Sequence, residues 1–420
     1  MKYLILGNGP TGVIAAETMR KTDPAGEIVL AGNEPEPPYS RMAIPYLLEG
    51  NIDEAGTYLR KAADHFEKLN IRQRQGRAVA LDTKKRSVLF DDGGRESYDR
   101  MLIATGSHPI RPPIPGIDLP QVHTCWTLED ARAIAAMAKP GSRVVQLGAG
   151  FIGCIIMQAL HARGVDLTVV EMGDRMVPRM MTHTAGTMIR EWVEAQGIKV
   201  RTKASVERID PGSGDTPLQV KLSTGDVLPC DLLIAAAGVV PNVSFLESTP
   251  VHVAKGVLVN EMQETSVPGI YAAGDVAEAP DLFTGAHMVS AIQPNAADQA
   301  RVAALNMAGR KVKLPGVLAI NVLATLGMVS SSFGQWWGTD QNDGVELVDP
   351  DHNRYLSLQF NDDVLIGATA IGLTQHVGVL RGLIQNRIPL GPWKAVLKES
   401  PLRFAEAYVA RSQQPTALLH

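Results

Sequence analysis

The sequence predicts an α/β fold in which two similar βαβ units precede a separate α+β domain. A strand, a glycine-rich turn and a helix occur near residue 7 and again near residue 148, and this long-range repeat is the first observation behind the prediction. The second is the change after about residue 314 to short strands such as YLSLQF and then helices. The chain has 420 residues, 45% of them hydrophobic, which is enough for two or three domains.

The first βαβ unit begins the chain. KYLIL at residues 2–6 predicts a strand, GNGPTG follows, and a helix is expected to end near Lys21, before Pro24. EIVLAGNE supplies the second strand. We expect a helical segment around residues 56–69 and then short strands up to residues 98–106 (YDRMLIATG).

The second βαβ unit follows a proline-rich stretch, residues 107–120, that predicts an extended connection between domains. After a helix near residues 127–138 come RVVQLGAG, a helix ending at Arg163 and the strand DLTVVE. Strands are expected around residues 199–234 and at residues 269–278.

The glycines of the first turn have separate tasks in a dinucleotide-binding loop. Gly7 permits the tight turn, Gly9 lets a pyrophosphate approach the backbone, and Gly12 lets helix and strand pack closely. The helix N-terminus offers N–H groups and a partial positive charge to phosphates. Glu34 ends the second strand, where a carboxylate can accept hydrogen bonds from ribose hydroxyls. The pattern predicts a nucleotide site.

The second turn repeats this logic with Gly148, Gly150 and Gly153. Glu171 ends the next strand, and a carboxylate there binds a free 2′-hydroxyl but repels a 2′-phosphate, so the second ligand is expected to be NAD rather than NADP. Met172 follows instead of a basic residue. Two nearby arginines, Arg175 and Arg179, leave use of both nucleotides open.

Composition excludes several classes of protein. A formal net charge of -4 argues against nucleic acid as a general partner. The three cysteines, Cys125, Cys154 and Cys230, form no disulfide framework and no metal-binding spacing, which fits a reducing compartment. The N-terminus leaves no room for a signal peptide and no apolar run is long enough to cross a membrane. We expect a soluble cytoplasmic protein without a metal site.

Five ordered motifs resemble those of the FAD/NAD-linked pyridine nucleotide-disulfide oxidoreductases over about residues 1–310. They are the two glycine loops, MLIATG, AAGVVPN and TSVPGIYAAGDVAE. EPPYSRMAIPYLLEG resembles the ferredoxin and rubredoxin reductase and nitrite reductase flavoprotein branch. The resemblance implies a three-layer, glutathione reductase-like α/β fold with two Rossmann-like domains. It divides the chain into an FAD domain (1–110 and 241–312), an NAD domain (111–240) and a C-terminal α+β interface domain for partner docking (313–420).

The resemblance also implies two sets of cofactor-binding residues. Asp275 would hold the ribityl or phosphate end of FAD, and Val79 would offer backbone contacts to adenine, although a core valine is an equal reading. The FAD set is Gly7, Gly9, Pro10, Thr11, Gly12, Glu34, Arg41, Val79, Ala104, Thr105, Gly106 and Asp275. The NAD set is Gly148, Gly150, Phe151, Ile152, Gly153, Glu171 and Gly238. A helix from Pro294 to about Met307 would aim its N-terminus at the flavin pyrimidine, where its dipole favours the anion of reduced flavin.

The chain departs from the thiol-dependent relatives. It has no cysteine before Cys125, so the CxxxxC pair and the single cysteine expected near residues 42–44 are both absent, and SQQPTALLH at the end holds no His–Glu pair. Thiol chemistry is therefore not expected, and all three cysteines are interpreted as packing residues.

A second departure concerns charge beside the flavin. Relatives often read GxGxxGxE, with the glutamate paired to a lysine near the flavin, and Ile155 and Tyr46 stand at these two positions. The loss of both members of this pair is physically consistent, because losing only one would leave a buried charge unpaired and destabilise the folded state. Tyr46, Ile155 and Pro294 are expected near the isoalloxazine. His287 could also lie there, but a loop or packing histidine is the favoured reading.

Without a thiol relay, electrons are expected to leave singly to an iron–sulfur protein or subunit. The chain has no thiolate set for a cluster of its own. Residues 377–410 resemble tails of NADH-linked flavoprotein subunits of tungsten-containing aldehyde oxidoreductases and phenylglyoxylate-type dehydrogenases. This favours a hetero-oligomeric complex, with a homodimer left open. The alternatives are a stand-alone NADH:rubredoxin or ferredoxin reductase and an NADH-responsive binding flavoprotein similar to apoptosis-inducing factor.

The C-terminal domain offers few further candidates for function. Four basic residues there could dock an acidic partner, although charges scattered on helices usually face solvent. They are Arg381, Arg387, Lys394 and Lys398. Trp336 and Trp337 are interpreted as core or interface residues rather than a substrate platform.

Overall fold

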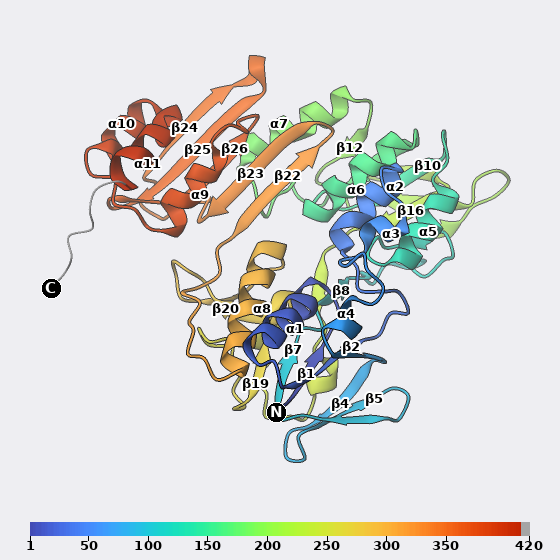
Figure 1. Cartoon of the computed structure of the whole chain (residues 1–420). Helices are drawn as coiled ribbons and strands as arrows, with labels where there is room; N and C mark the ends of the chain where they lie inside the picture. The colour runs from blue at the N-terminus through green and yellow to red at the C-terminus, as the bar shows by residue number, and fades with distance from the viewer. Residues whose placement is uncertain (413–420) are drawn as a thin grey trace. The chain divides into compact units, whose positions relative to one another are not determined.

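The computed structural model describes residues 1–412 and contains two compact units (Figure 1). Each unit is built from two chain segments. Unit 1 comprises Met1–Pro109 and Val239–Leu318, and unit 2 comprises Ile110–Gly238 and the chain from Ala319 onward. The C-terminal segment therefore clusters with the segment that carries the second glycine loop.

Unit 1 is centred on a parallel five-stranded sheet. Its strands, in spatial order, are β19 (Ile270–Ala272), β7 (Arg100–Ile103), β1 (Lys2–Leu6), β2 (Glu27–Gly32) and β3 (Ile71–Gln75). Helices α1 (Pro10–Thr22) and α8 (Gln293–Met307) contact each other and pack with Tyr3 and Ile5 of β1. Leu4 and Leu6 of the same strand belong to a second core on the opposite face. Both faces of the sheet are buried, which explains why its strands, apart from the edge strand β3, are mainly apolar.

Two small three-stranded sheets and one strand pair complete unit 1. The first sheet is β4 (Ala78–Asp82), β5 (Ser87–Phe90) and β6 (Arg95–Ser97), and the second is β18 (Val257–Leu258), β20 (Ala277–Pro280) and β21 (His287–Val289). The pair joins β8 (Ser107–Pro109) to β17 (Val239–Pro241) where the chain leaves and re-enters the unit. Short helices α2 (Ile44–Glu49), α3 (Glu54–Thr57) and α4 (His65–Lys68) lie between β2 and β3 in the chain.

Unit 2 contains a second parallel sheet of five strands. In spatial order they are β12 (Lys199–Arg201), β11 (Asp166–Val170), β10 (Arg143–Leu147), β16 (Leu232–Ala235) and β9 (Val122–His123). The helices of this part are α5 (Leu128–Met137), α6 (Phe151–Ala162) and α7 (His183–Ala195). An antiparallel sheet of β13 (Val206–Pro211), β14 (Leu218–Leu222) and β15 (Val227–Cys230) shares a core with Val145 and Val170 of the main sheet.

The C-terminal part of unit 2 is an antiparallel five-stranded sheet with three helices beside it (Figure 1). The strands, in spatial order, are β22 (Ile320–Thr325), β23 (Met328–Gly334), β26 (Val364–Ile371), β25 (Arg354–Asn361) and β24 (Gly344–Asp349). The helices are α9 (Val377–Gln385), α10 (Trp393–Glu399) and α11 (Phe404–Ser412). Helix α7 is tied to this sheet, because the Thr182 hydroxyl at its N-cap donates to the Tyr355 hydroxyl at 2.8 Å.

The predicted fold class is confirmed, with one wrong element. The helix expected around residues 56–69 is replaced by α3 and α4 with a loop between them. The reason is a long-range ion pair: Arg60 donates two hydrogen bonds of 2.6 Å to Glu17 on α1, and His65 contacts the same carboxylate at 2.8 Å. Helix α8 begins at Gln293, one residue before Pro294.

Two further predictions concern membrane-spanning helices and the C-terminal end of the chain. Within residues 1–412, no helix combines the length and apolar character that a membrane-spanning helix needs. The terminal stretch SQQPTALLH, in which no His–Glu pair is expected, lies outside the described residues apart from Ser412.

Candidate functional site

The first glycine loop joins β1 to α1 and has no room for side chains on its inner side. A Cβ on Gly7, whose φ is +114°, would lie 2.0 Å from the Ala104 carbonyl oxygen. A Cβ on Gly12 would lie 1.8 Å from the Gly7 carbonyl oxygen. A Cβ on Gly9 would meet no atom within 4 Å, so the outer side of the loop is open. The three glycines therefore have the tight turn, the open approach and the close packing that a pyrophosphate loop requires.

The second glycine loop, between β10 and α6, has the same geometry. A Cβ on Gly148 (φ +103°) would lie 2.4 Å from the Ala236 carbonyl oxygen, and one on Gly153 would lie 2.4 Å from the Gly148 carbonyl oxygen. Gly150 again faces open space. Phe151 and Ile152 are the first two residues of α6 and are half-buried.

The helices after both loops lack side-chain caps, unlike two other helices of the chain. Thr127 and Thr182 cap α5 and α7 with their hydroxyls, whereas α1 and α6 have Gly9 and Gly150 at the N-cap with no side-chain hydrogen bond. Their first-turn N–H groups are thus left without a cap from the chain. Such N–H groups bind phosphates, so the residues present fit two dinucleotides.

Glu34, at the end of the second strand of unit 1, is held by side chains from the following loop. Arg41 donates to one carboxylate oxygen at 2.5 Å, and the Tyr39 hydroxyl donates to the other. Arg41 also donates to the Tyr39 hydroxyl at 3.0 Å. The three side chains form one charged cluster beside the glycine loop of unit 1. Tyr39 is a residue that the sequence reasoning missed.

The strand end at Ala104, Thr105 and Gly106 is clamped by Asn242, another residue that was missed. The Asn242 side chain donates to the Thr105 carbonyl at 2.7 Å, and the Thr105 hydroxyl donates to the Asn242 carbonyl at 2.9 Å. The clamp joins two of the quoted motifs, MLIATG and AAGVVPN, inside unit 1.

Asp275 is a half-buried residue that contacts Ser107, which lies two residues after Thr105 of the clamp. Its Oδ2 accepts a hydrogen bond of 2.9 Å from the Ser107 hydroxyl. Burial raises the pKa of Asp275, while Ser107 and Arg41 act in the opposite direction. Helix α8 follows with Pro294 near its start and no side-chain cap, so it also presents an open N-terminus in unit 1.

Three other candidates in unit 1 are exposed. Tyr46 on α2 is 54% exposed. Val79 on β4 is 39% exposed, so its reading as a core valine is wrong. His287 on β21 is exposed and contacts the Val259 carbonyl at 3.0 Å. Ile155, the residue expected to accompany Tyr46, is half-buried on α6 of unit 2.

Glu171, the strand-end carboxylate of unit 2, is held by backbone instead of side chains. One oxygen accepts from the Ala149 N–H at 2.8 Å and the other from the Gly173 N–H at 2.7 Å. Arg175 is already occupied, because it donates to Asp174 and to two backbone carbonyls. Arg179 is exposed and is therefore the arginine that remains for a 2′-phosphate.

Gln146 is a third missed residue, beneath the second loop. Its side chain is fully buried in β10, and its Nε2 donates to the Gly148 carbonyl at 2.8 Å. Its Oε1 has no hydrogen-bond partner among the described residues. A buried amide in a central parallel strand is unusual, which is the signal that sequence reasoning could have used. Gly238, the last residue of the predicted NAD set, accepts a hydrogen bond of 2.8 Å at its carbonyl from the Ile110 N–H.

All three cysteines lie in unit 2 and are buried. Burial raises the pKa of each thiol from 9.0 to about 12. A thiol in this state is not a nucleophile at neutral pH, so the interpretation of the cysteines as packing residues agrees with their surroundings.

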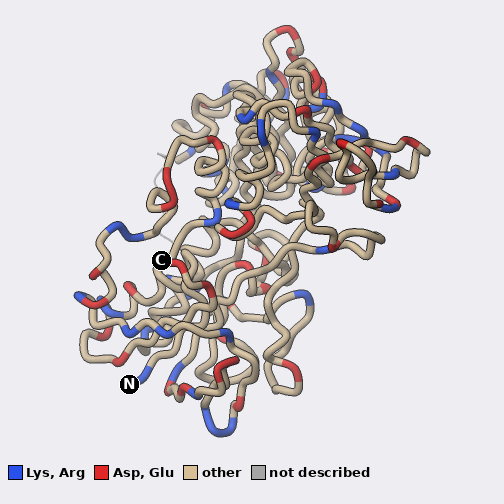
Figure 2. The backbone as a smooth tube through the Cα atoms, turned by 90° about the vertical axis from the view of Figure 1, so that its right-hand side faces the viewer, with Lys and Arg blue, Asp and Glu red and all other residues tan. Residues whose placement is uncertain are grey.

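The basic residues of the C-terminal helices are partly engaged within the fold. Lys394 and Lys398 contact opposite oxygens of Asp343 at 2.7 and 2.5 Å. Both hydrogen bonds lower the pKa of Asp343, and Lys394 has the larger effect. These two lysines are therefore paired within the fold, and their role in docking an acidic partner stays a prediction. Figure 2 shows acidic and basic residues interspersed along the chain. Trp336 is buried and meets Trp337, which is 60% exposed, edge to face at 5.5 Å.

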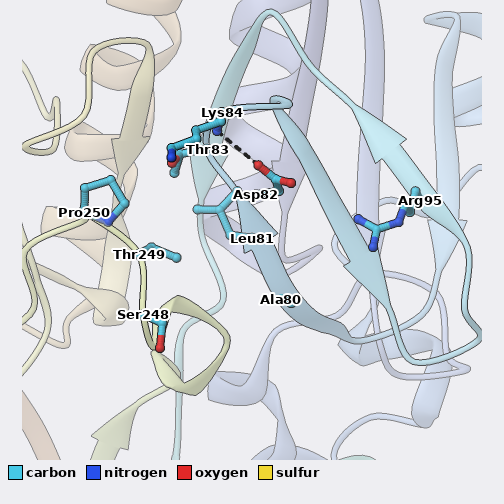
Figure 3. A pocket seen from close by; sticks show the side chains of 9 residues that line it. All are labelled: Ala80, Leu81, Asp82, Thr83, Lys84, Arg95, Ser248, Thr249 and Pro250. Atoms are coloured by element: carbon cyan, nitrogen blue, oxygen red, sulfur yellow. Dashed lines mark hydrogen bonds between the residues drawn. The ribbon is translucent and has the colours of Figure 1, made fainter.

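A separate hollow of 730 Å³ lies in unit 1 between β4, β6 and residues 248–250 (Figure 3). None of the predicted cofactor residues lines it. Its Asp82 carboxylate accepts from the Lys84 N–H at 3.1 Å and so shapes the hairpin turn rather than facing a ligand. The predicted dinucleotide sites are the two open glycine loops, and this hollow contains none of their residues.

Two parallel sheets, each with a glycine loop, an uncapped helix and a carboxylate at the next strand end, define a two-dinucleotide oxidoreductase. The chain belongs to the pyridine nucleotide-disulphide oxidoreductase family, whose sequence profile matches residues 1–290. It is an FAD-dependent NAD(H) oxidoreductase, and its cofactors are FAD and NAD(H). The suspected branch, with ferredoxin and rubredoxin reductases, nitrite reductase and the phenylglyoxylate dehydrogenase subunit, is confirmed.

Three similar proteins show the range of this family. The epsilon subunit of NADH-dependent phenylglyoxylate dehydrogenase from Aromatoleum evansii is 31% identical over 96% of this chain and 95% of its own length. An NADH oxidase from Methanocaldococcus jannaschii is 33% identical over 76% of this chain and 72% of its own. The crystal structure of the ferredoxin reductase for the CYP199A2 system from Rhodopseudomonas palustris has a TM-score of 0.82 at 27% identity, covering 88% of this chain and 91% of that one.

Proposed function

We propose that this enzyme moves electrons between NAD(H) and a separate iron–sulfur electron-transfer protein, without a redox-active cysteine. Bound FAD supplies the chemistry, because it exchanges hydride with nicotinamide and single electrons with a metal cluster. The observation that carries the proposal is the state of the thiols. Unit 1, which holds every predicted FAD residue, contains no cysteine, and the three thiols of unit 2 are buried with raised pKa values.

The residues of the chain have distinct tasks in this proposal. The open N-termini of α1 and α6 bind the two pyrophosphates, and the Glu34 and Glu171 carboxylates receive ribose hydroxyls. Asp275 and the N-terminus of α8 hold the flavin end of FAD. Neither Tyr46 nor Ile155 can form the lysine–glutamate pair that relatives place near the flavin, so this pair is not part of the proposed function.

We propose further that the chain is the NAD-linked flavoprotein subunit of a larger cytoplasmic redox complex. End-to-end similarity to a subunit named for an NADH-dependent dehydrogenase supports this role. Unpaired cysteines fit a reducing compartment. In this proposal the chain has three domains, with residues 313–420 as the part that docks the partner subunit.

The stand-alone reductase is the second candidate. It is favoured by similarity over 88% of this chain to a ferredoxin reductase of known structure. Purification of the natively expressed chain separates the two: co-purifying iron–sulfur subunits support the complex, and a monodisperse, fully active lone chain contradicts it. Both roles require that NADH reduce a one-electron acceptor at tens of turnovers per second.

A binding flavoprotein would behave differently in the same assay. It would form a long-lived complex of reduced flavin and NAD with negligible turnover. Rapid NADH-driven reduction of ferricyanide, no reduction of disulfide substrates and slow reduction of dioxygen are the results expected from the proposed function. Fast oxygen consumption would instead favour an oxidase.

A further inference from the structure

The segment between Glu171 and helix α7, residues 172–182, contacts the second glycine loop of unit 2. The Val177 N–H donates to the Ala149 carbonyl of that loop at 2.9 Å. Val177 is buried and has a φ of +51°, a strained conformation for a β-branched residue. Such a conformation persists only where the surrounding structure enforces it. The segment is therefore held in place by other parts of unit 2.

The contact with Ala149 concerns the part of the loop that faces a nucleotide. The Ala149 carbonyl and the Gly150 N–H belong to one peptide plane, so a hydrogen bond to the carbonyl fixes the direction of the N–H. Gly150 is the N-cap of α6 and has no side-chain cap, and N–H groups at such a helix start bind phosphates. The Ala149 N–H is held as well, because it donates to Glu171 at 2.8 Å. The segment therefore helps to set the geometry of the predicted NAD site.

Hydrogen bonds within the segment connect Val177 to the start of α7. The N–H groups of Met180 and Met181 both donate to the Val177 carbonyl, at 3.0 and 3.1 Å. The Arg175 side chain donates to the Met181 carbonyl at 3.3 Å. The next residue, Thr182, is the N-cap of α7. Because the segment is bonded internally in this way, a displacement of Thr182 is transmitted to Val177.

Thr182 is bonded to the C-terminal sheet through the hydroxyl of Tyr355. The Thr182 hydroxyl accepts from the Ala185 N–H at 3.3 Å and donates to the Tyr355 hydroxyl on β25 at 2.8 Å. Tyr355 is fully buried and donates in turn to Glu346 on β24 at 2.8 Å. Because an ionised carboxylate only accepts hydrogen bonds, Glu346 sets the direction of both bonds. The start of α7 cannot move relative to this sheet without breaking the bond to Tyr355.

We propose that Tyr355, on the C-terminal sheet, is a positioning residue of the NAD site. Through Thr182 it fixes the segment before α7, in which the Val177 N–H holds the Ala149 carbonyl of the glycine loop. A binding group gains affinity when the residues behind it hold it in the bound geometry. The inference rests on the proposed NAD site at residues 148–153. It assigns part of the nucleotide affinity to the C-terminal segment, which contributes no residue to the predicted NAD set.

The test compares Tyr355→Phe with Tyr98→Phe in the FAD-loaded full-length enzyme. Calorimetric titration with NAD and the KM for NADH with ferricyanide as acceptor are measured. Tyr355→Phe removes the bond to Thr182 and is expected to raise Kd and KM about threefold to tenfold, with kcat within about twofold of the parent. Tyr98→Phe is the matched control, because it removes a buried hydroxyl that has no hydrogen-bond partner among the described residues, and both values should stay unchanged. Thr182→Val removes the donor and should give the same rise, whereas Thr182→Ser keeps the hydroxyl and should restore the parent values.

Unchanged Kd and KM in folded Tyr355→Phe would overturn the proposal, and so would a lowered melting temperature with unchanged affinity. If Tyr355→Phe does not fold, Glu346→Leu removes the acceptor of the Tyr355 hydroxyl at an exposed position of the edge strand β24 and is held to the same expectation. Gly153→Val separates this inference from the site itself. If Gly153→Val leaves NAD binding intact, the proposed NAD site fails, whereas loss of binding in Gly153→Val with a silent Tyr355→Phe contradicts only the role of Tyr355.

Discussion

The two glycine loops have the same backbone geometry but different support. In unit 1 the residue two positions before the first glycine is Ile5, which packs in the apolar core. The strand-end carboxylate of this unit, Glu34, accepts hydrogen bonds from the side chains of Tyr39 and Arg41. In unit 2 the equivalent position holds Gln146, whose side chain donates a hydrogen bond to the Gly148 carbonyl. The strand-end carboxylate of this unit, Glu171, accepts a hydrogen bond from the backbone N–H of Ala149 in the loop itself.

We attribute this difference to how long each ligand stays. A loop around a resident cofactor is held in place by the cofactor, since binding stabilises the bound conformation. A loop that releases its nucleotide in every turnover has to keep its shape while empty. Internal hydrogen bonds from Gln146, Glu171 and Cys154 do this in unit 2. Two copies of a repeated motif can therefore share every glycine and still be stabilised by different contacts.

The largest effect is expected for Gly12→Val in the loop of unit 1. Its side chain would collide with the Gly7 carbonyl, because even a Cβ would lie 1.8 Å from that oxygen. The purified protein should contain less than about a tenth of the normal FAD, measured by the ratio of flavin to protein absorbance, because backbone collisions of this kind cost several kcal/mol. Gly378→Ala, where a Cβ meets nothing, is the control. Normal flavin content would refute the assignment of this loop to FAD.

The corresponding change in unit 2, Gly153→Val, should separate the two loops. We expect FAD to remain bound and dithionite still to reduce it. Reduction by NADH should slow about a hundredfold or more, because the loop and its helix can no longer pack closely. Stopped-flow absorbance of the flavin measures both reactions. Simultaneous loss of FAD would show that the loops are not independent.

Glu171→Ala tests the carboxylate that binds its own loop. Two charge-assisted hydrogen bonds to backbone are lost, so the KM for NADH should rise about tenfold or more. The preference for NADH over NADPH should shrink at the same time, because the charge that repels a 2′-phosphate is gone and Arg179 is exposed. Steady-state kinetics with both nucleotides measure this. An unchanged preference would show that Glu171 does not determine the choice between NADH and NADPH.

A smaller effect is expected from making the two loops alike. Gln146→Leu removes the support of the Gly148 carbonyl and also an unpaired buried oxygen. The KM for NADH should rise about threefold, while the melting temperature stays level or increases. The reverse change, Ile5→Gln, places an amide in an apolar core and should destabilise the protein by about 1–3 kcal/mol. Urea unfolding monitored by flavin fluorescence compares the two.

The smallest effect concerns the three thiols of unit 2, which we expect to be chemically silent. With pKa values raised from 9.0 to about 12, the cysteines should not react with iodoacetamide at pH 8, and NADH-dependent activity should be unchanged. Because the folded pKa lies above the unfolded value, each protonated thiol contributes stability that is complete below pH 9 and is lost as the pH rises towards 12. Rapid labelling with loss of activity would contradict the thiol-independent mechanism.

The sequence was a good guide wherever local chemistry decides structure. The glycine loops, their strands and the strand-end carboxylates were predicted because turn geometry and apolar runs are local signals. The helix over residues 56–69 was wrong because one distant carboxylate, Glu17, draws Arg60 and His65 to itself. Tyr39, Asn242 and Gln146 were missed for a related reason: each acts through a contact that only the folded chain creates.

The order of segments along the chain has a consequence for synthesis on the ribosome. Strand β19 pairs with β7, and α8 contacts α1, yet both arrive only after the whole first segment of unit 2 has emerged. Until then β7 is an unprotected sheet edge, of the kind that pairs with other chains. Nascent unit 1 therefore remains unfinished and prone to misassembly while the first segment of unit 2 is made. Rapid elongation through residues 110–238 would shorten this interval, and a chaperone on the exposed edge of β7 would protect it meanwhile.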